Sequence, residues 1–405
     1  MGTMPSRKRK AGSQSPKDGY SEAAKTAVQE TTRRVQEMHD VIAGKSFNVL
    51  RRIPVISGPA RLVQSAHDAI SNGVYAAVHR GAGGLLKAAG MLERHVADSR
   101  PAAPPGRRAS ALLAALNGAF GDHLANSNNR LAITMSLHAN GAPLALTPDA
   151  LRSALPEAGT RLCLLIHGLG CDERTWVSGK SAAPSGVDFG RQLQADFAYT
   201  PVYLRYNTGV SIAENSVQLA GLLEKLIQAW PNKPAEMLII GHSMGGLIAL
   251  GACEHAAEST LQWPFSTRMV ICLGSPYLGS PVERLGELAT SVLNRFAVTA
   301  PLGKIAATRS QGIKDLRRGP GAPRSQPAHA HIAFRFLGAS LLEESEHPLG
   351  EILGDGLVGP GSATTHEIEG DVQSARLGKA SHMGLLNDVR VYRQIREWIS
   401  SDPLS

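Results

Sequence analysis

Short apolar runs alternate with helix-like segments over the C-terminal two thirds of the chain. The runs that we interpret as strands cover residues 162–166, 202–206, 237–240, 269–273, 332–337 and, more weakly, 375–378. Apolar positions at helical spacing occupy residues 189–197, 211–229, 247–255 and 385–399. Apolar strands separated by helices are typical of a parallel sheet whose two faces are both covered. The pattern therefore predicts an α/β domain.

Two segments depart from this alternation. Residues 131–137 and 143–146 flank Asn140-Gly141, a pair that favours a two-residue hairpin. Residues 281–330 are rich in helix formers and then become loose and basic. We interpret this second segment as a helical cap or lid inserted over the site.

The first 108 residues follow a different pattern from the rest. Residues 1–20 are polar and basic, which is typical of a disordered tail. Residues 21–108 contain two stretches with helical spacing and end in a linker rich in proline. We therefore expect a helical N-terminal extension before a catalytic domain over residues 109–405.

Charge separates the same two parts of the chain. Residues 1–160 hold 20 Lys and Arg against 11 Asp and Glu, a net charge of +9, whereas residues 161–405 hold 22 against 23, a net charge of −1. The basic excess therefore says nothing about the substrate of the C-terminal domain. The longest basic run, residues 7–10, has no aromatic residues interleaved with it, so nucleic-acid binding is not expected.

Neither a secretion signal nor a membrane span is visible in the sequence. The basic start has no apolar run after it, and the longest uncharged stretches are broken by polar residues. We expect a cytoplasmic protein. The alternative is that the helices of residues 1–108 lie on an anionic membrane surface or bind a partner, whereas docking on the catalytic domain is the simpler interpretation. The oligomeric state is left open.

The four cysteines do not suggest a disulfide framework or a metal site. Cys163 and Cys272 lie inside apolar runs, and none of the four forms a CxxC pair. We interpret Cys163 and Cys272 as free thiols of the core and assign no residue to a metal site, although a structural calcium is left open.

The strongest chemical signal is the run Gly241-His242-Ser243-Met244-Gly245. It matches G-x-S-x-G, and it lies between an apolar strand and a helical pattern. A serine on so sharp a turn is exposed as a nucleophile, and the helix that follows directs backbone N–H groups toward a developing oxyanion. The alternative is a tight glycine turn without chemistry. We predict that Ser243 is the nucleophile.

A second glycine-rich turn, His167-Gly168-Leu169-Gly170, directly follows the first core strand. The loop at this place supplies the second oxyanion donor in hydrolases with such an elbow. We assign the oxyanion hole to the backbone N–H groups of Leu169 and Met244. The alternative is an ordinary loop between a strand and a helix. His167 precedes the nucleophile in the chain, and we interpret it as a structural neighbour rather than the base.

The acid and the base are predicted from chain order, because this fold requires serine, then acid, then histidine. Asp355 lies in a Gly-Asp-Gly turn after the strand 332–337, with Asp315 and Asp371 as competitors. His382 precedes the C-terminal helix, with His366 as its competitor. We predict that Asp355 orients His382, which serves as the general base.

Together these runs resemble the esterase/lipase branch of the α/β-hydrolase superfamily. HGLG, GHSMGG, GSPYLGSP, GDGLV and SHMGLLNDVRVYRQIREWI carry the likeness over roughly residues 125–400, and within the branch it is greatest to bacterial lipases related to the GPI inositol-deacylases. The resemblance implies an eight-stranded sheet, a Ser-His-Asp triad, no organic cofactor, and ester hydrolysis through an acyl-enzyme. Ser275 and Tyr277 stand where that group usually has Thr and His.

The expected function is hydrolysis of a carboxylic ester or a lipid-like small molecule. We expect the substrate to contact His167, Gly168, His242 and Tyr277. An amidase, a thioesterase or an acyltransferase remains open, because the same acyl-enzyme serves all of them.

Overall fold

The protein is described here from a computed structural model. It describes residues 106–126, 128–129, 131–177, 188–232, 234, 236–277, 310–318, 331–340 and 370–401. All of them lie in one compact unit, Pro101–Ala297 together with Gly303–Ser405. The expected tail, the helical stretches before residue 106, most of the inserted segment 281–330 and Asp355 lie outside the described residues.

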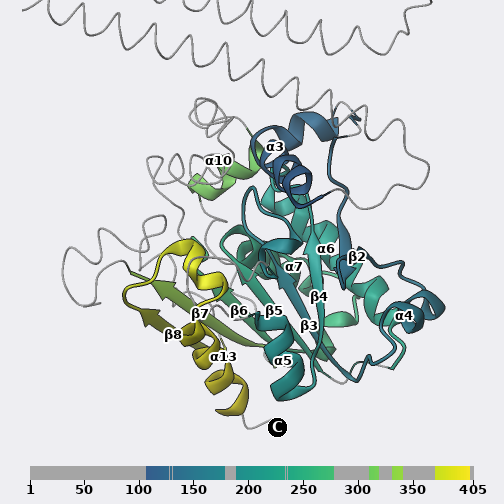
Figure 1. The fold of residues 1–405 in the computed structure, drawn as a ribbon, viewed down its shortest axis with the longest axis vertical. Coiled ribbons are helices and arrows are strands. Elements are labelled where there is room, and N and C mark those ends of the chain that lie inside the picture. The colour runs from purple at the N-terminus through teal and green to yellow at the C-terminus, as the bar shows by residue number, and fades with distance from the viewer. Residues whose placement is uncertain are drawn as a thin grey trace, which may run out of the picture. The chain divides into compact units, whose positions relative to one another are not determined.

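An eight-stranded sheet forms the centre of the domain, as expected (Figure 1). Its strand order is β2-β1-β4-β3-β5-β6-β7-β8. Strands β3 to β8 all run parallel, while β1 is antiparallel to both of its neighbours. The strands are β1 (Ser136–Ala139), β2 (Ala142–Pro143), β3 (Arg161–Ile166), β4 (Thr200–Arg205), β5 (Glu236–His242), β6 (Thr267–Leu273), β7 (Ala333–Ala339) and β8 (Val372–Leu377). The central strands therefore end on one edge, where a site is expected in an open parallel sheet.

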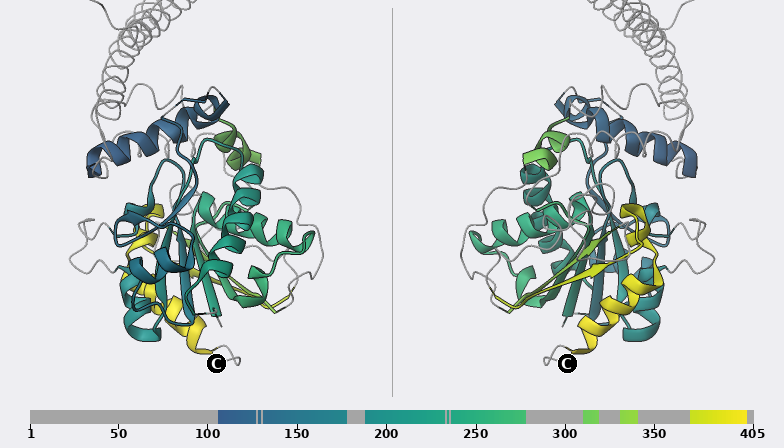
Figure 2. Two further views of the ribbon diagram at one scale, coloured as in Figure 1. Left: turned by 90° about the vertical axis from the view of Figure 1, so that its right-hand side faces the viewer. Right: turned by 90° about the vertical axis from the view of Figure 1, so that its left-hand side faces the viewer.

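Helices cover both faces of this sheet (Figure 2). On one face lie α6 (Ile212–Ala229) and α7 (Met244–Ala257), and on the other lie α5 (Phe189–Phe197) and α13 (Val389–Ser401). The α5 bounds coincide with the predicted segment, and α6 and α7 lie within a few residues of theirs. The prediction of helices on both faces is confirmed.

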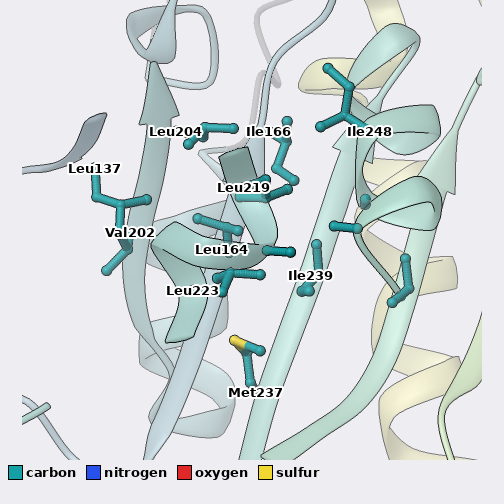
Figure 3. Packing of buried hydrophobic residues seen from close by; sticks show 14 of the residues in the cluster. Leu137, Leu164, Ile166, Val202, Leu204, Leu219, Leu223, Met237, Ile239 and Ile248 are labelled. Atoms are coloured by element: carbon teal, nitrogen blue, oxygen red, sulfur yellow. The ribbon is translucent and has the colours of Figure 1, made fainter. Parts of the chain in front are cut away.

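The alternation of side chains along each strand divides the core into two apolar clusters. In β3, Leu164 and Ile166 face α6 and α7, while Cys163 and Leu165 face α5 and α13. Figure 3 shows the first cluster, in which Leu219 of α6 packs against side chains from β3, β4 and β5. Cys163, Cys253 and Cys272 are buried free thiols, and burial raises the pKa of each.

The predicted hairpin forms around Asn140 and Gly141, whose φ angles are 52° and 79°. Both residues thus adopt the left-handed region that a two-residue hairpin turn requires. The strands are shorter than predicted, because β1 begins at Ser136 rather than at residue 131. After the hairpin, α4 (Pro148–Ala154) begins with Thr147 as its N-cap, whose hydroxyl accepts from the N–H of Ala150.

The C-terminal helix differs from the prediction of one helix over residues 385–399. It is divided into a short 3₁₀ helix, η3 (His382–Leu386), and α13, which begins at Val389. The physical reason lies at Asp388, whose carboxylate accepts from the N–H of Arg390 and whose carbonyl accepts from that of Tyr392. Asp388 thereby starts a new helix, which separates His382 from α13.

Two further helices, α3 (Arg107–Asn126) and α10 (Gln311–Arg318), lie side by side at one end of the sheet (Figures 1 and 2). Ser310 donates a hydrogen bond to the carbonyl of Gly118, and the N–H of Gln311 donates to Asp122 of α3. Helix α10 falls inside the predicted insertion, and its apolar face joins the first core cluster through Ile313 and Leu316. Among the described residues no helix has the length and apolar character needed to cross a bilayer.

Helix α6 provides a test of the core. Leu219 is fully buried, whereas Val217 on the same helix is 48 % exposed. Leu219→Ala should lower the free energy of unfolding by about 2–5 kcal/mol, since it leaves a cavity in the cluster of Figure 3. The matched control Val217→Ala should change it by less than about 0.5 kcal/mol. Urea unfolding of both variants measures the difference, and equal losses would contradict this packing.

Candidate active site

Ser243 forms the turn between β5 and α7, and its backbone is strained. Its φ is 55° and its ψ is −122°, outside the regions that residues with a side chain normally adopt. Such a conformation costs on the order of 1–3 kcal/mol and persists only where the surroundings enforce it. The N–H of Ser243 donates to the carbonyl of Leu273 on β6, and its own carbonyl accepts from the N–H of Gly246. The turn is therefore held from both sides.

Glycine is required at both flanks of this turn by close approach of backbones. A Cβ atom at position 241 would lie 2.4 Å from Cα of Gly246, and one at position 245 would lie 2.5 Å from the carbonyl oxygen of Ile166. Helix α7 thus begins in direct contact with both β5 and β3. This explains why the motif needs glycine two residues before and two residues after Ser243.

The loop after β3 lies against Ser243. A Cβ atom at position 168 would lie 3.0 Å from Cβ of Ser243 and 3.1 Å from Nδ1 of His242. Within the described part of the chain the N–H of Leu169 donates no hydrogen bond, whereas the next two do: Gly170 to Thr208 and Cys171 to Gly168. Met244 is the first residue of α7, where an N–H has no acceptor within the helix. Both predicted oxyanion donors thus lie on the two backbone segments that meet at the serine.

His382 comes to the same place from the C-terminal end of the chain. It opens η3 and is 2 % exposed. Its ring lies 4.7 Å from the His242 ring, centroid to centroid, and a Cβ atom at position 274 would lie 3.2 Å from both Nδ1 and Cε1 of His382. The structure therefore gathers Ser243, His242, Gly168 and His382 around the carboxyl ends of β3, β5 and β6.

A hydrogen bond fixes the tautomer of His242. Its Nε2 lies 3.0 Å from the backbone carbonyl oxygen of His382. A carbonyl only accepts, so Nε2 carries the proton. The ring of Trp176 meets that of His242 edge-on, with the centroids 6.5 Å apart. His242, the residue before the nucleophile, is therefore bonded to the backbone of the predicted base.

His167 is the first residue of the loop after β3, and its side chain is buried. Its ring stacks on Tyr206 at 4.5 Å, and its Nδ1 lies 3.0 Å from the carbonyl oxygen of Gly168, to which it donates. Burial lowers the pKa of His167, which favours the neutral ring. Its exposed fraction is 1 %, and it packs within its own loop, as expected of a structural neighbour.

The predicted acid Asp355 lies outside the described residues, but both of its competitors have other partners. Asp315 accepts from the N–H of Ile212 and thereby caps α6. Asp371 forms a two-pronged ion pair with Arg335 on β7, with nitrogen-to-oxygen distances of 3.0 and 2.8 Å. Each of these carboxylates thus has a structural role away from His382.

Tyr277 is buried at 2 % exposure and belongs to the same apolar cluster as Leu169 and Met244.

Sequence reasoning missed the loop that follows β4. There the hydroxyl of Tyr206 donates to the carbonyl of His167, and Thr208 accepts from the N–H of Gly170. Polar residues directly after a core strand are visible in the sequence, but only the fold shows that this strand pairs with β3 and brings them to the loop.

No set of His, Cys, Asp and Glu side chains among the described residues is arranged to hold a metal ion. A cavity of about 530 Å³ lies elsewhere, beside the 3₁₀ helix η1 (Glu173–Thr175), and its lining includes His138 and Arg174 but none of the predicted site residues.

Comparison with known proteins identifies the family of the chain. The sequence profile described as "Alpha/beta hydrolase family" matches residues 163–394, more than half of the chain. The chain belongs to the alpha/beta hydrolase family. The match includes Ser243 and His382. A search of curated proteins found no match.

Solved structures with a similar fold include esterases and lipases. The mature lipase BlEst2 of Bacillus licheniformis has 16 % sequence identity and a TM-score of 0.45, over 66 % of this chain and 98 % of that one. A thermophilic esterase of Thermogutta terrifontis has 17 % identity and a TM-score of 0.37, over 60 % and 91 %. A carboxylesterase structure of Nitrososphaera gargenis has 16 % identity and a TM-score of 0.38, over 60 % and 92 %.

The helix η1 follows the loop after β3 closely and is anchored by buried polar groups. Glu173 pairs with Arg205, and its carboxylate lies 3.9 Å from Nδ1 of His138. Burial lowers the pKa of His138 from an ordinary 6.5 to about 4, while Glu173 opposes this decrease and Arg205 and Arg174 add to it.

The sign of the pH dependence follows from this shift. The unfolded chain binds a proton on His138 below pH 6.5, but the folded protein does so only near pH 4, so stability should fall as the pH drops through this interval. His138→Asn should flatten that part of the curve, as measured by urea unfolding at several pH values. The control His123→Asn, at an exposed position on α3, should leave the slope unchanged. An unchanged slope in His138→Asn would contradict the assignment.

Proposed function

We propose that this protein is a serine hydrolase that cleaves carboxylic esters through Ser243, His382 and Asp355. The strained backbone of Ser243 carries the proposal, since a serine held in this conformation between a strand and a helix is the arrangement of a nucleophile elbow. The gathering of His382 with Ser243 supports it, because segments 139 residues apart in the sequence meet there.

The reaction would begin with attack of Ser243 Oγ on the ester carbonyl. His382 takes the hydroxyl proton and then donates it to the leaving alcohol, which produces an acyl-enzyme. Water, activated by His382, releases the acid and restores the serine. Asp355 holds the imidazole in the required tautomer and stabilises its protonated form.

The negative charge that develops on the carbonyl oxygen would be stabilised by the N–H groups of Leu169 and Met244. Such a donor is worth about 2.7–4 kcal/mol of transition-state stabilisation in hydrolases. The N–H of Leu169 donates to no other group among the described residues, which leaves it available for this purpose. The dipole of α7 adds positive potential at the same point.

The substrate class that we propose is an ester or lipid-like small molecule. Gly168 and His242 lie beside the nucleophile, while His167 and Tyr277 would form the wall behind the acyl group. Within the esterases, the motif resemblance favours the branch related to the GPI inositol-deacylases. Amidase, thioesterase and acyltransferase activities are the alternatives on the same triad. For residues 1–108, association with a membrane surface or a partner remains a proposal.

Replacement of the nucleophile tests the reaction directly. Ser243→Ala should lower kcat by roughly 10⁶-fold and abolish labelling by a fluorophosphonate probe, since the probe reacts with an activated serine. The matched control is Ser216→Ala on α6, because Ser216 and Ser243 are each 3 % exposed. This variant should still be labelled. Labelling that persists in Ser243→Ala would overturn the assignment.

The wild-type protein is assayed in parallel on p-nitrophenyl esters of increasing acyl length. Turnover of at least one ester, with a preference along the series, is the expected result. Absence of turnover at every chain length would contradict esterase function.

The identity of the acid has a test of its own. Asp355→Asn should lower kcat by on the order of 10⁴-fold, because the neutral amide favours the wrong imidazole tautomer. Asp371→Asn is the matched control, since Asp371 pairs with Arg335; it should reduce stability but keep kcat near the wild-type value. The opposite ranking of the two kcat values would assign the acid to Asp371.

A further inference from the structure

We propose that Thr208 is a positioning residue that, together with helix α3, holds the oxyanion loop (residues 167–171) so that the N–H of Leu169 faces the reacting carbonyl. This inference rests on the proposed function. It concerns a residue that contacts neither the nucleophile nor the base in the observed contacts and that acts through the backbone of the loop.

The loop is fastened on both sides of Leu169 by residues that follow β4. On one side the hydroxyl of Tyr206 donates to the carbonyl of His167 at 2.8 Å. On the other side the N–H of Gly170 donates to Oγ1 of Thr208 at 3.0 Å. Thr208 thus accepts from the N–H of Gly170, whereas the N–H of Leu169 donates to no group among the described residues. Both fastening residues are 1 % exposed, so water does not compete for these bonds.

Thr208 is itself held in place by its neighbours in the chain. The side-chain amide of Asn207 donates to the carbonyl of Gly121 on α3, and that of Asn215 on α6 donates to the carbonyl of Asn207. The N–H of Gly312 on α10 donates to the carbonyl of Gly209 at 3.1 Å. Three helices thus fix the segment from which Thr208 reaches the loop.

Helix α3 supports the loop from behind. A Cβ atom at position 118 would lie 3.0 Å from Cα of Gly170 and 3.3 Å from Oγ1 of Thr208. In the first turn of α3, Ser110 donates to the carboxylate of Asp172 at 2.6 Å. Helix α3 therefore contacts the loop at Gly170 and is bonded to Asp172, the residue that follows the loop.

The chemical consequence follows from the geometry that an oxyanion donor needs. The donor must lie about 2.7–3.1 Å from the oxygen in the transition state, and a shift of about 1 Å can cost about 100-fold in rate. Loss of the Thr208 bond frees the peptide between Leu169 and Gly170 to rotate. The ground-state ester depends little on that donor, so kcat should change while KM does not.

The first test replaces Thr208 in two ways. Thr208→Val keeps the shape but removes the acceptor, and it should lower kcat on a p-nitrophenyl ester roughly 10- to 100-fold with KM nearly unchanged. A trifluoromethyl ketone, which forms an oxyanion at the serine, should bind more weakly by the same factor. Thr208→Ser, which restores the hydroxyl, should recover most of the rate.

Another buried threonine, Thr200 at the start of β4, provides the control. Oγ1 of Thr200 accepts from the N–H of Gly159 at 3.3 Å, at the other end of the strand. Thr200→Val therefore removes the same kind of bond and should cost similar stability, but it should leave kcat and ketone binding at their wild-type values. An equal loss of kcat in both variants would reduce Thr208 to a structural role and overturn the proposal.

A pair of glycine variants tests the contact with α3 without removing any hydrogen bond. Gly118→Ala places a methyl group against Gly170 and should lower kcat several-fold by displacing the loop. Gly221→Ala, on α6, places the same methyl group where nothing lies within 4 Å and should leave kcat unchanged. Wild-type kcat in both Gly118→Ala and Thr208→Val would overturn the proposal, whereas turnover that survives Ser243→Ala would overturn the proposed function itself.

Discussion

The close approach of three backbone segments at the end of β5 is the constraint on which the rest of the structure depends. Helix α7 starts so near to β3 and β5 that neither Gly241 nor Gly245 can carry a side chain, and Ser243 is forced between them into a conformation with φ of 55°. That strain is tolerated because the apolar clusters on both faces of the sheet fix the strand positions. Packing in the core thus supplies the energy that keeps the serine at the turn.

The same edge of the sheet also collects His382 and the loop after β3. The carboxyl ends of β3 and β4 carry the loop 167–171 and the segment that bonds to it, and His382 follows β8 at the start of η3. Helices α3 and α10 lie over this edge and bond to each other and to the loop after β4. Residues 106–126 therefore form part of the structure that surrounds the site, although they precede the first strand. The inserted segment likewise contributes a docked helix whose apolar face belongs to the core.

Much of this was predictable from the sequence because it depends on local patterns. Strands β3 to β7 and helices α5 to α7 follow from apolar runs and spacing, and the elbow around Ser243 follows from its glycines. The division between η3 and α13 was not predictable in this way, since Asp388 ends one helix and starts another through its own hydrogen bonds. Helix α3 and Thr208 were missed for a different reason. Their importance arises from contacts between residues 38 to 62 positions apart, which no periodicity reveals.

The central claim is that acyl transfer passes through a covalent bond to Ser243. The most direct measurement is mass spectrometry of the protein quenched during turnover of a p-nitrophenyl ester, followed by mapping of the modified peptide. We expect the mass of one acyl group to be added to the protein, on the peptide that contains Ser243, together with an initial burst of nitrophenol. Turnover without any covalent acyl group, or an acyl group on a different residue, would contradict the account.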